Sequence, residues 1–390
     1  MSESFDVVVI GGGVIGCATA WELARAGASV AVIEKGVLAG GSTGRSSAIV
    51  RQHYSNETTA RMALHGLRVF QDFDERVGGE CGFVPAGFVV LVPAEDAEGL
   101  EANVALQQGV GINTEVLPAE ALKDVVPNIA SADLVAAAYE PEAGYADPHM
   151  TTQGLADAAK RLGARFFLGR AVTGIRFESG RVTGVDTAEG PILAGRVVNC
   201  AGPWGARVAA LAGVEVPVNS CRAQVSVFGR PKQHVGPHPV VLDFAHASYF
   251  RPETGDLMLV GLIDPSEADD VVDPDDYPEH TDRDFDLDVG ERLIARCPPM
   301  EAAEPRRGYA GLYAITPDWH PVIDEVPAGS GHFLCTGFSG HGFKLAPAVG
   351  LMTAEMVLGA APTFDARMFR LARFAENDPV RGTYDYSITG

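Results

Sequence analysis

Three glycines near the start of the chain, Gly11, Gly13 and Gly16, have the G-x-G-x-x-G spacing of a site that binds a pyrophosphate. The first permits a tight turn, the second lets backbone amides approach phosphate oxygens, and the third lets a helix pack closely on a strand. Glu34 follows at the end of the next apolar segment, where its carboxylate can accept hydrogen bonds from a ribose diol. The spacing predicts a dinucleotide site, but it does not by itself distinguish NAD from FAD.

Two further glycine-rich segments, residues 40–47 and 336–344, bear on this choice. The first offers backbone amides and hydroxyl groups that could line a pyrophosphate, a ribityl chain and the edge of a flavin ring; the alternative is a flexible surface loop. The second precedes a helix expected to start near Leu345, so its amides would form a second anion site at a helix N-terminus. A dinucleotide with phosphates at one end and an electron-rich ring at the other needs both sites, which favours FAD.

Two basic residues beside these segments could bind a substrate anion. Arg51 follows the first segment, and its planar guanidinium suits a carboxylate. Lys344 opens the last helix, where a cation is electrostatically unfavourable and therefore indicates a specific role. The alternatives are a surface ion pair for Arg51 and a helix-terminal surface lysine for Lys344.

Alternating strands and helices must position these residues. Residues 5–10 are apolar and β-branched, residues 14–26 have helical spacing, and residues 29–33 form a second apolar run, which together predict a strand–helix–strand unit. Similar segments recur later, whereas the two stretches between them are rich in short β-like runs. We expect a discontinuous α/β nucleotide-binding domain and a mostly antiparallel second domain, with the segments 1–81, 149–215 and 317–390 for the first and 82–148 and 216–316 for the second.

The overall composition limits the classes of partner. The chain has 390 residues, 46% of them hydrophobic, which suits a globular protein with more than one core. A formal net charge of −21 disfavours nucleic acids and anionic membranes as partners. The N-terminus lacks a basic region, and the apolar run 7–20 is too short and glycine-rich to span a membrane, so we expect a cytoplasmic protein without a membrane span.

Neither the cysteines nor the acidic residues predict a metal site. The six cysteines have no C-x-x-C pair and lie mostly in apolar runs, which is typical of structural thiols in a reducing compartment. Much of the negative charge lies in residues 264–288, which lack the alternating ligands and central glycine of a calcium loop. We expect this stretch to be a solvated acidic loop.

Taken in order, these motifs resemble the D-amino-acid oxidase superfamily of FAD-dependent oxidoreductases. The sequence is most similar to the branch of sarcosine oxidases, glycine oxidases and amino-acid dehydrogenases. The resemblance implies a Rossmann-type FAD-binding domain (α/β) interleaved with a substrate domain built on a large, mostly antiparallel sheet. It rests on residues 11–16 with Glu34, and on residues 41–47, 201–204, 311–318 and 337–344.

The resemblance also implies which residues bind the cofactor. Glycines and hydroxyl side chains would contact the phosphates and the flavin, the backbone of Val172 would lie beside the adenine, and His341 would donate to the flavin or shape its turn. The implied set is Gly11, Gly13, Val14, Ile15, Gly16, Glu34, Lys35, Ser42, Thr43, Arg45, Ser46, Ser47, Val172, Ala201, Gly202, Trp204, Gly311, Gly340, His341, Gly342, Phe343 and Lys344.

On the substrate side, the resemblance implies that Arg51 and Lys344 hold a substrate carboxylate and that Tyr249 faces the substrate. A strand aromatic in the core is the alternative for Tyr249. Weaker candidates for the same site are His53, His341 and Tyr313.

The implied activity is oxidation of the C–N bond of a small amino acid (glycine-like, sarcosine-like or N-substituted) by hydride transfer to the flavin, after which the imine hydrolyses. Gly311 occupies the position where some members attach the flavin through a cysteine, and the early loop has no histidine, so we expect non-covalent FAD. Residues 257–260 contain no lysine of the kind that activates oxygen in monomeric sarcosine oxidases. The expected electron acceptor is therefore O2 or a partner protein or quinone.

Three alternatives remain open. The substrate could be another small anion, such as a D-amino acid, a proline-like compound, a 2-hydroxy acid or glycerol phosphate. The chain could act as a subunit of a larger electron-transferring complex. It could also be a flavin-binding protein without turnover or an NAD-binding module, although both anion sites and the cationic pair would then be unused.

Overall fold

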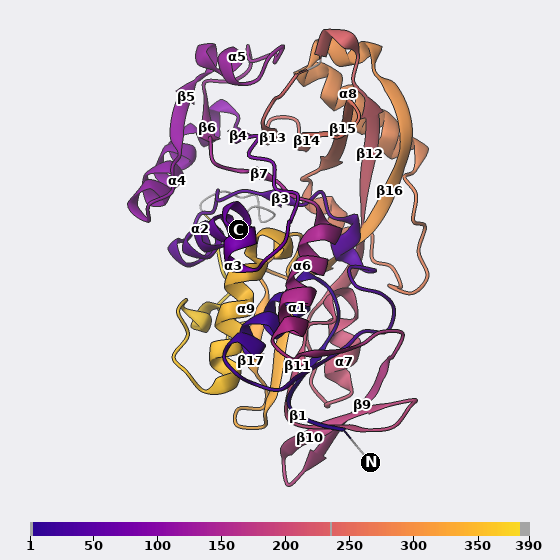
Figure 1. The fold of residues 1–390 in the computed structure, drawn as a ribbon. Helices are drawn as coiled ribbons and strands as arrows, with labels where there is room; N and C mark the ends of the chain where they lie inside the picture. Colours follow the sequence, from indigo (N-terminus) through magenta and orange to yellow (C-terminus); the bar gives the residue numbers. More distant parts are fainter. Residues whose placement is uncertain (1–2, 235, 383–390) are drawn as a thin grey trace.

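The computed structural model describes residues 3–234 and 236–382, so the ends of the expected nucleotide-binding segments, 1–2 and 383–390, lie outside it. Within the described residues, the strands form two eight-stranded sheets and one two-stranded sheet. Figure 1 shows the two large sheets one above the other, each assembled from segments that are far apart in the sequence.

The lower sheet is mixed and has the strand order β17-β18-β11-β1-β2-β8, with the β9–β10 hairpin attached to β11. β1 pairs in parallel with β2 and β11, and the pairs β2–β8 and β11–β18 are also parallel. The predicted strand–helix–strand unit thus forms the centre of this sheet. Its strands are β1 (Glu3–Ile10), β2 (Val30–Ile33), β8 (Arg165–Phe167), β9 (Val172–Glu178), β10 (Arg181–Thr187), β11 (Ile192–Asn199), β17 (Val322–Glu325) and β18 (His332–Thr336).

Alternation along β1 explains the layers of the lower half. Val7 and Val9 pack among helices on one face, whereas Val8 and Ile10 point to the other face, against the β9–β10 hairpin. Both faces of β1 are covered, which is typical of a central parallel strand. The helices of the first face are α1 (Val14–Arg25), α2 (Glu57–Gln71) with α3 (Phe73–Arg76), α6 (Pro148–Arg161) and α9 (Gly342–Leu358), and α7 (Gly205–Ala210) follows β11.

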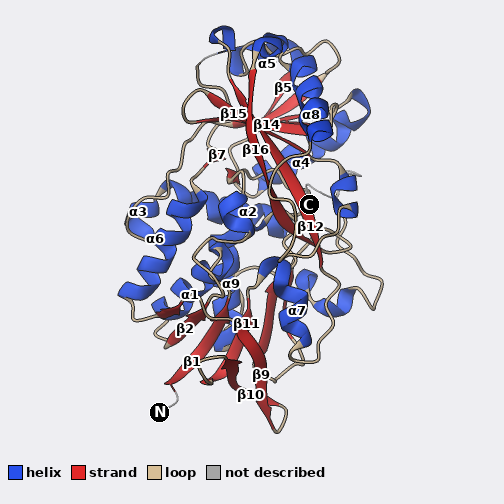
Figure 2. Cartoon of the chain, turned by 90° about the vertical axis from the view of Figure 1, so that its right-hand side faces the viewer, coloured by secondary structure: helices blue, strands red, loops and turns tan. Residues whose placement is uncertain are grey.

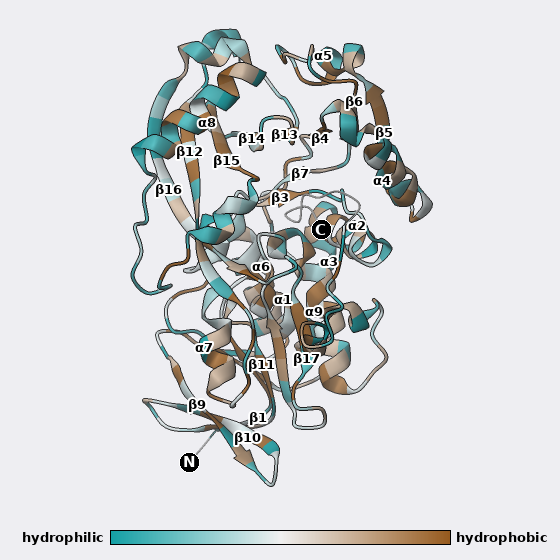
Figure 3. Cartoon of the chain, turned by 180° about the vertical axis from the view of Figure 1, so that it is seen from behind, coloured by the Kyte–Doolittle hydropathy of each residue, from teal (hydrophilic) through white to brown (hydrophobic). Residues whose placement is uncertain are grey.

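Small residues bring α1 and α9 close together. A Cβ atom added at Gly350 of α9 would lie 2.7 Å from the backbone of Ala18 in α1, so a larger residue would push the helices apart. At the other end of the contact, a Cβ at Gly342 would lie 3.8 Å from Cδ1 of Ile15. Figure 3 shows the hydrophobic residues that both helices carry into this region. The N-termini of the two helices are therefore neighbours.

The upper sheet has the order β16-β12-β15-β14-β13-β4-β6-β5 and is antiparallel except for the parallel pair β4–β13. One face packs on α5 and α8, and α4 packs on the opposite face. The elements are β4 (Phe88–Leu91), β5 (Glu115–Pro118), β6 (Ala136–Glu140), β12 (Asn219–Gly229), β13 (Val240–Asp243), β14 (Ser248–Glu253), β15 (Leu257–Leu262), β16 (Glu304–Ile315), α4 (Ala97–Gly109), α5 (Leu122–Val125) and α8 (Arg283–Arg296).

Two features join the halves. β3 (Ile49–Val50) pairs with β7 (Gly144–Tyr145) as a small separate sheet. The long strands β12 and β16 extend from the upper sheet toward the lower half, as the side view in Figure 2 shows. The predicted fold class, a mixed α/β sheet interleaved with a large, mostly antiparallel sheet, is confirmed. The residue boundaries between the domains stay a prediction.

None of the helices within residues 3–234 and 236–382 combines the length and the apolar character needed to cross a membrane.

Candidate cofactor and substrate site

A large cavity of about 730 Å³ is lined by residues from both large sheets. Its walls include the start of α1, the end of β2, parts of β12 and β16 and the start of α9. Gly13 and Gly340, which belong to glycine-rich turns near opposite ends of the sequence, both border it. The two predicted anion sites therefore face a common cavity.

The first glycine-rich turn is fixed by close backbone contacts. Gly11 has a φ of +112°, and a Cβ atom there would overlap the carbonyl oxygen of Cys200. A Cβ at Gly16 would overlap the carbonyl oxygen of Gly11, so α1 can start directly against β1 only with glycine at this position. Gly13 is the N-cap of α1 and makes no side-chain cap hydrogen bond, so it places no side chain over this helix end, which borders the cavity.

The hydroxyl-rich segment after β2 lies against this helix end. It contains the 3-10 helix η1 (Ser42–Arg45), in which Thr43 Oγ1 accepts a hydrogen bond from the Val14 amide at 3.2 Å. A Cβ at Gly13 would lie 3.1 Å from the same oxygen. The segment borders the cavity and is therefore not a free surface loop.

Glu34, at the end of β2, is oriented by two backbone amides. Its Oε2 accepts a hydrogen bond from the Gly12 amide, and its Oε1 accepts one from the Gly36 amide, both at 2.7 Å. The carboxylate is thus held at the cavity wall through both oxygens. A carboxylate there can still accept hydrogen bonds from a ribose diol through its remaining lone pairs, and it repels a 2′-phosphate.

The last glycine-rich turn packs against Tyr313. Gly340 has a φ of +84°, and a Cβ there would lie 3.1 Å from the Tyr313 ring. α9 begins at Gly342 and not near Leu345, so the predicted start was wrong by three residues and Lys344 lies inside the first turn. Glycine has a low helix propensity, but a Cβ at Gly342 would lie 3.2 Å from Cβ of Phe338, so the tight turn before α9 favours a residue without a side chain there.

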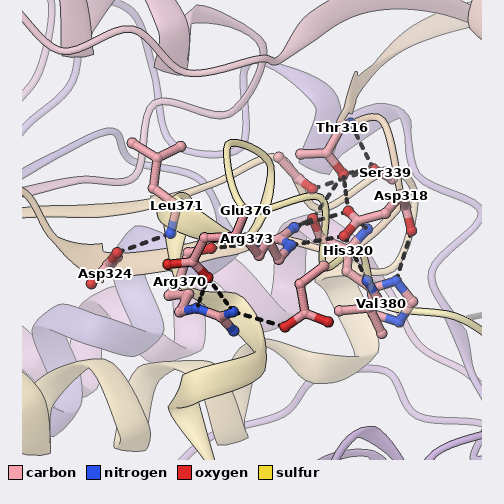
Figure 4. A network of polar contacts seen from close by, with 12 residues as sticks. Thr316, Asp318, His320, Asp324, Ser339, Arg370, Leu371, Arg373, Glu376 and Val380 are labelled. Atoms are coloured by element: carbon pink, nitrogen blue, oxygen red, sulfur yellow. Dashed lines mark hydrogen bonds and ion pairs between the residues drawn. The ribbon is translucent and has the colours of Figure 1, made fainter.

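A buried network of hydrogen bonds and one ion pair holds Ser339, the residue that precedes Gly340 in this turn, as Figure 4 shows. The Thr316 amide donates to Ser339 Oγ at 3.2 Å, and Thr316 Oγ1 donates to the carbonyl oxygen of His320 at 2.8 Å. Arg373 donates to both oxygens of Asp318 at 2.7 and 2.9 Å. Burial alone would raise the pKa of Asp318, but the hydrogen bonds and charge of Arg373 hold it below its usual value. The segment after α9 is thereby tied to the strand that carries Tyr313.

Arg51 and Lys344 are each 6% exposed and both border the cavity. The Arg51 guanidinium donates to the carbonyl oxygen of His53 and lies 4.6 Å from the centre of the Tyr54 ring. Lys344 Nζ reaches the carbonyl oxygen of Gly340 at 3.5 Å. Within residues 3–234 and 236–382, no carboxylate lies within ion-pair distance of either cation. Burial and the charge of Arg51 lower the pKa of Lys344 well below its usual value.

The upper half of the molecule positions the segment that carries Arg51. Glu140, fully buried at the end of β6, accepts a hydrogen bond from the Gln52 amide at 2.8 Å, and Gln107 of α4 donates to the Tyr54 carbonyl oxygen at 3.2 Å. Burial raises the pKa of Glu140 to about 7. Burial and the charge of Arg51 lower the pKa of His53 to about 3, so this histidine is neutral near pH 7, and it does not border the cavity.

The remaining predicted side chains lie on the cavity wall. Tyr249, on β14, has its hydroxyl 2.6 Å from Ser47 Oγ in the hydroxyl-rich segment, and Tyr313 borders the same space. Burial raises the pKa of both phenols, so each keeps its proton. His341 Nδ1 lies 3.1 Å from the Tyr54 hydroxyl, and burial together with nearby cations lowers the pKa of His341 well below its usual value, which keeps the imidazole neutral.

All the predicted catalytic and cofactor-binding residues except Gly16 border the cavity, and Gly16 serves the packing of α1 on Gly11. Their individual roles stay predictions. Sequence reasoning missed an apolar wall from the upper sheet and two charged residues at the Glu34 end. Alternation along the β-rich runs could have selected such wall residues, but it could not tell which face meets the cavity. The missed residues include Phe88, Ala223, Val225, Leu242, Leu262, Ile263, Arg170 and Asp275.

The acidic stretch 264–288 forms ion pairs with distant parts of the chain. Asp275 pairs with Lys35 and Arg207, and Asp282 pairs with Arg222, although both aspartates stay 52% exposed. The expectation of a loop was wrong for residues 283–288, which form the start of α8.

Comparison with known proteins gives consistent matches along the chain. A family model described as FAD dependent oxidoreductase matches residues 6–356. Human mitochondrial sarcosine dehydrogenase is 30% identical across 96% of the chain, which spans 42% of that protein's length. Sarcosine oxidase subunit beta of Rhodobacter capsulatus is 28% identical, with 96% of the chain and 89% of the subunit aligned. The solved L-proline dehydrogenase from P.horikoshii has a TM-score of 0.90 and 28% identity, covering 97% of this chain and 100% of that one.

We predict that Glu34→Gln weakens FAD binding about ten- to hundredfold. The glutamine side chain has only one acceptor oxygen, so one of the two backbone N–H groups would face its NH2 group instead. Such an unpaired donor costs roughly 1–3 kcal/mol. Quenching of flavin fluorescence on titration of the apoprotein gives the dissociation constant. Glu57→Gln, at an exposed position in α2, is the matched control and should bind FAD like the wild type. Equal affinities for Glu34→Gln and wild type would contradict the assignment.

Proposed function

The chain belongs to the family of FAD-dependent oxidoreductases, and on that premise we propose that it oxidises the C–N bond of a small amino acid with a free carboxylate. Glycine-like, sarcosine-like and other N-substituted amino acids are the proposed class. The family, the cofactor FAD and the oxidoreductase class predicted from the sequence are confirmed.

The observation that carries this proposal is the pair of buried cations, Arg51 and Lys344. Burying a charge without a partner is costly, and two like charges at one cavity increase that cost. A substrate carboxylate offsets it, because it can take two hydrogen bonds from the guanidinium and an ion pair from the ammonium group. A small anion is therefore the ligand that best complements this end of the cavity.

The protein's part in the reaction is mainly orientation. Arg51 and Lys344 hold the carboxylate, and Tyr249 and Tyr313 limit the position of the rest of the substrate. Apolar residues of the upper sheet, such as Phe88, reduce the access of water. When bound, FAD supplies the acceptor for a hydride from the α-carbon. The released imine then hydrolyses in water.

The relatives support two substrate subclasses. A sarcosine dehydrogenase and a sarcosine oxidase subunit support an N-methyl amino acid, and the proline dehydrogenase structure supports a proline-like secondary amine. D-amino acids and 2-hydroxy acids carry the same carboxylate and are the alternative substrates. The relative named as a subunit supports a partner chain, and the proposed electron acceptor is O2, a partner protein or a quinone. A cytoplasmic location stays a prediction.

We predict that Arg51→Ala raises KM about a hundredfold or more for amino acids, because a hydrogen-bonded charge pair in a buried site contributes roughly 2–5 kcal/mol. Anaerobic bleaching of the flavin with glycine derivatives, proline, D- and L-amino acids and 2-hydroxy acids identifies the substrate and gives its affinity. Amines without a carboxylate are the matched controls and should react equally poorly with both proteins. A similar loss for amines with and without a carboxylate would contradict the proposed clamp.

The lowered pKa of Lys344 predicts how anion binding depends on pH. A carboxylate binds the protonated lysine, so affinity should be highest at low pH and fall as the pH rises through the pKa of Lys344 in the free site. Titration of the flavin absorbance with acetate across a pH series measures this. Lys344→Met should bind acetate more weakly and lose this part of the pH dependence. Parallel profiles for the two proteins would argue against a role for Lys344.

We further propose that FAD is held without a covalent bond. Gly311 borders the cavity close to Arg45, and a Cβ there would already lie 3.0 Å from Arg45 Cβ, so the site offers no thiol at this position. Precipitation with acid should therefore release all the yellow colour into the supernatant. Flavin absorbance that stays with the washed protein pellet would contradict non-covalent binding.

A further inference from the structure

Residues 273–282, which we call the acidic strap, lie between β15 and α8 of the upper half and contact the nucleotide-binding half at several points. Four acidic side chains of the strap, Asp273, Asp275, Glu279 and Asp282, form ion pairs with basic residues elsewhere in the chain. Asp275 itself borders the cofactor cavity. The strap is therefore part of the cavity's surroundings, although none of the sequence motifs described above includes it.

Asp275 is the centre of the contacts at the Glu34 end of the cavity. Its Oδ1 accepts from Lys35 Nζ and from Trp204 Nε1, the latter at 2.9 Å, and its Oδ2 accepts from Arg207 Nη1 at 3.0 Å. Lys35 Nζ also lies 3.7 Å from the centre of the Trp204 ring. Arg207 forms a second ion pair, with Asp273, at 2.9 Å. Asp275, Lys35, Trp204 and Arg207 all border the cavity, so the strap contacts two segments of the cavity wall that are far apart in the sequence.

The middle of the strap contacts the hydroxyl-rich segment of the cofactor site. Arg45 in η1 donates to the Tyr277 hydroxyl at 3.0 Å and forms an ion pair with Glu279 at 2.6 Å. In the same 3-10 helix, Thr43 contacts the N-terminus of α1. The strap is thus attached to the loop that we expect to line the pyrophosphate and the flavin.

The far end of the strap has a buried anchor. Arg222 of β12 is 6% exposed and donates to both carboxylate oxygens of Asp282 and to the carbonyl oxygens of Pro278 and His280. The hydrogen bonds from Arg222 hold the pKa of Asp282 below its usual value. In contrast, the side chains of Lys35, Asp275 and Arg207 are 43–52% exposed. The guanidinium of Arg222 is protected from solvent although the Asp282 carboxylate is 52% exposed, whereas at Asp275 all three charged side chains can exchange contacts with water and salt.

We propose that the acidic strap closes the Glu34 end of the cofactor cavity and slows the release of FAD. The anchor at Arg222 and the hydrogen bond from the Val272 amide to the carbonyl oxygen of Ser220 keep both ends of the strap attached to β12, so breaking the exposed contacts of Asp275 lets the segment between them move away from the cavity. Because these contacts are exposed ion pairs, they weaken as ionic strength rises. The strap therefore makes retention of the cofactor dependent on salt.

The test compares Asp275→Asn with Asp276→Asn, which removes the same charge one residue further along. Asp276 does not border the cavity, and its side chain forms no ion pair within the described ranges. Release of FAD from each holoprotein is followed by the rise in flavin fluorescence after a large dilution into buffer, in which rebinding is negligible. Asp275→Asn should release FAD about three- to thirtyfold faster at low salt, since two exposed ion pairs and one hydrogen bond are weakened. Asp276→Asn should match the wild type.

Salt provides a second, independent comparison. In about 1 M NaCl the screening length falls to roughly 3 Å, so release from the wild type should accelerate and approach that of Asp275→Asn. Arg207→Gln should behave like Asp275→Asn, and the double variant should be little faster than either single one. Equal release rates for wild type and Asp275→Asn at low salt, or equal acceleration by Asp276→Asn, would overturn the proposal. These rates do not depend on the substrate, so the proposed amine oxidation is tested separately.

Discussion

Where α9 crosses α1, Gly350 allows the two backbones to approach so closely that both helices begin at the same cavity. The partial positive charge of a helix N-terminus extends only over its first turn, so two anion sites can serve one ligand only if the helix starts are neighbours. Gly11 and Gly16 provide the corresponding fit between α1 and β1. The common position of the two glycine-rich turns at the cavity follows from this packing of three elements.

The substrate end depends on a different set of contacts. Arg51 lies just after β3, and its segment is held by Glu140 and Gln107, which belong to the upper half. Lys344 belongs to α9, in the lower half. The two cations of the proposed clamp are therefore positioned by different halves of the molecule. The distance between them depends on how the two halves pack against each other.

The residues that could be predicted are those whose chemistry is local in the sequence. Gly11, Gly13 and Glu34 lie within one strand–helix–strand unit, so their spacing alone indicates the phosphate and ribose contacts. Asp275 could not be predicted, because its partner Lys35 is 240 residues away and nothing in an acidic run identifies the carboxylate that meets a distant lysine. The start of α9 was misplaced because its first residue, Gly342, continues the glycine-rich turn in the sequence and has a low helix propensity, so local signals do not mark it as helical.

The arrangement of the site along the chain has a consequence for biosynthesis. The phosphate-binding turn at residues 11–16 leaves the ribosome early, whereas the turn and helix that complete the same cavity span residues 337–358. A nascent chain therefore presents half of a nucleotide site during most of its translation. Loading of the cofactor must follow synthesis of α9, and until then the apolar surface of α1 is without the helix that covers it and is available to chaperones.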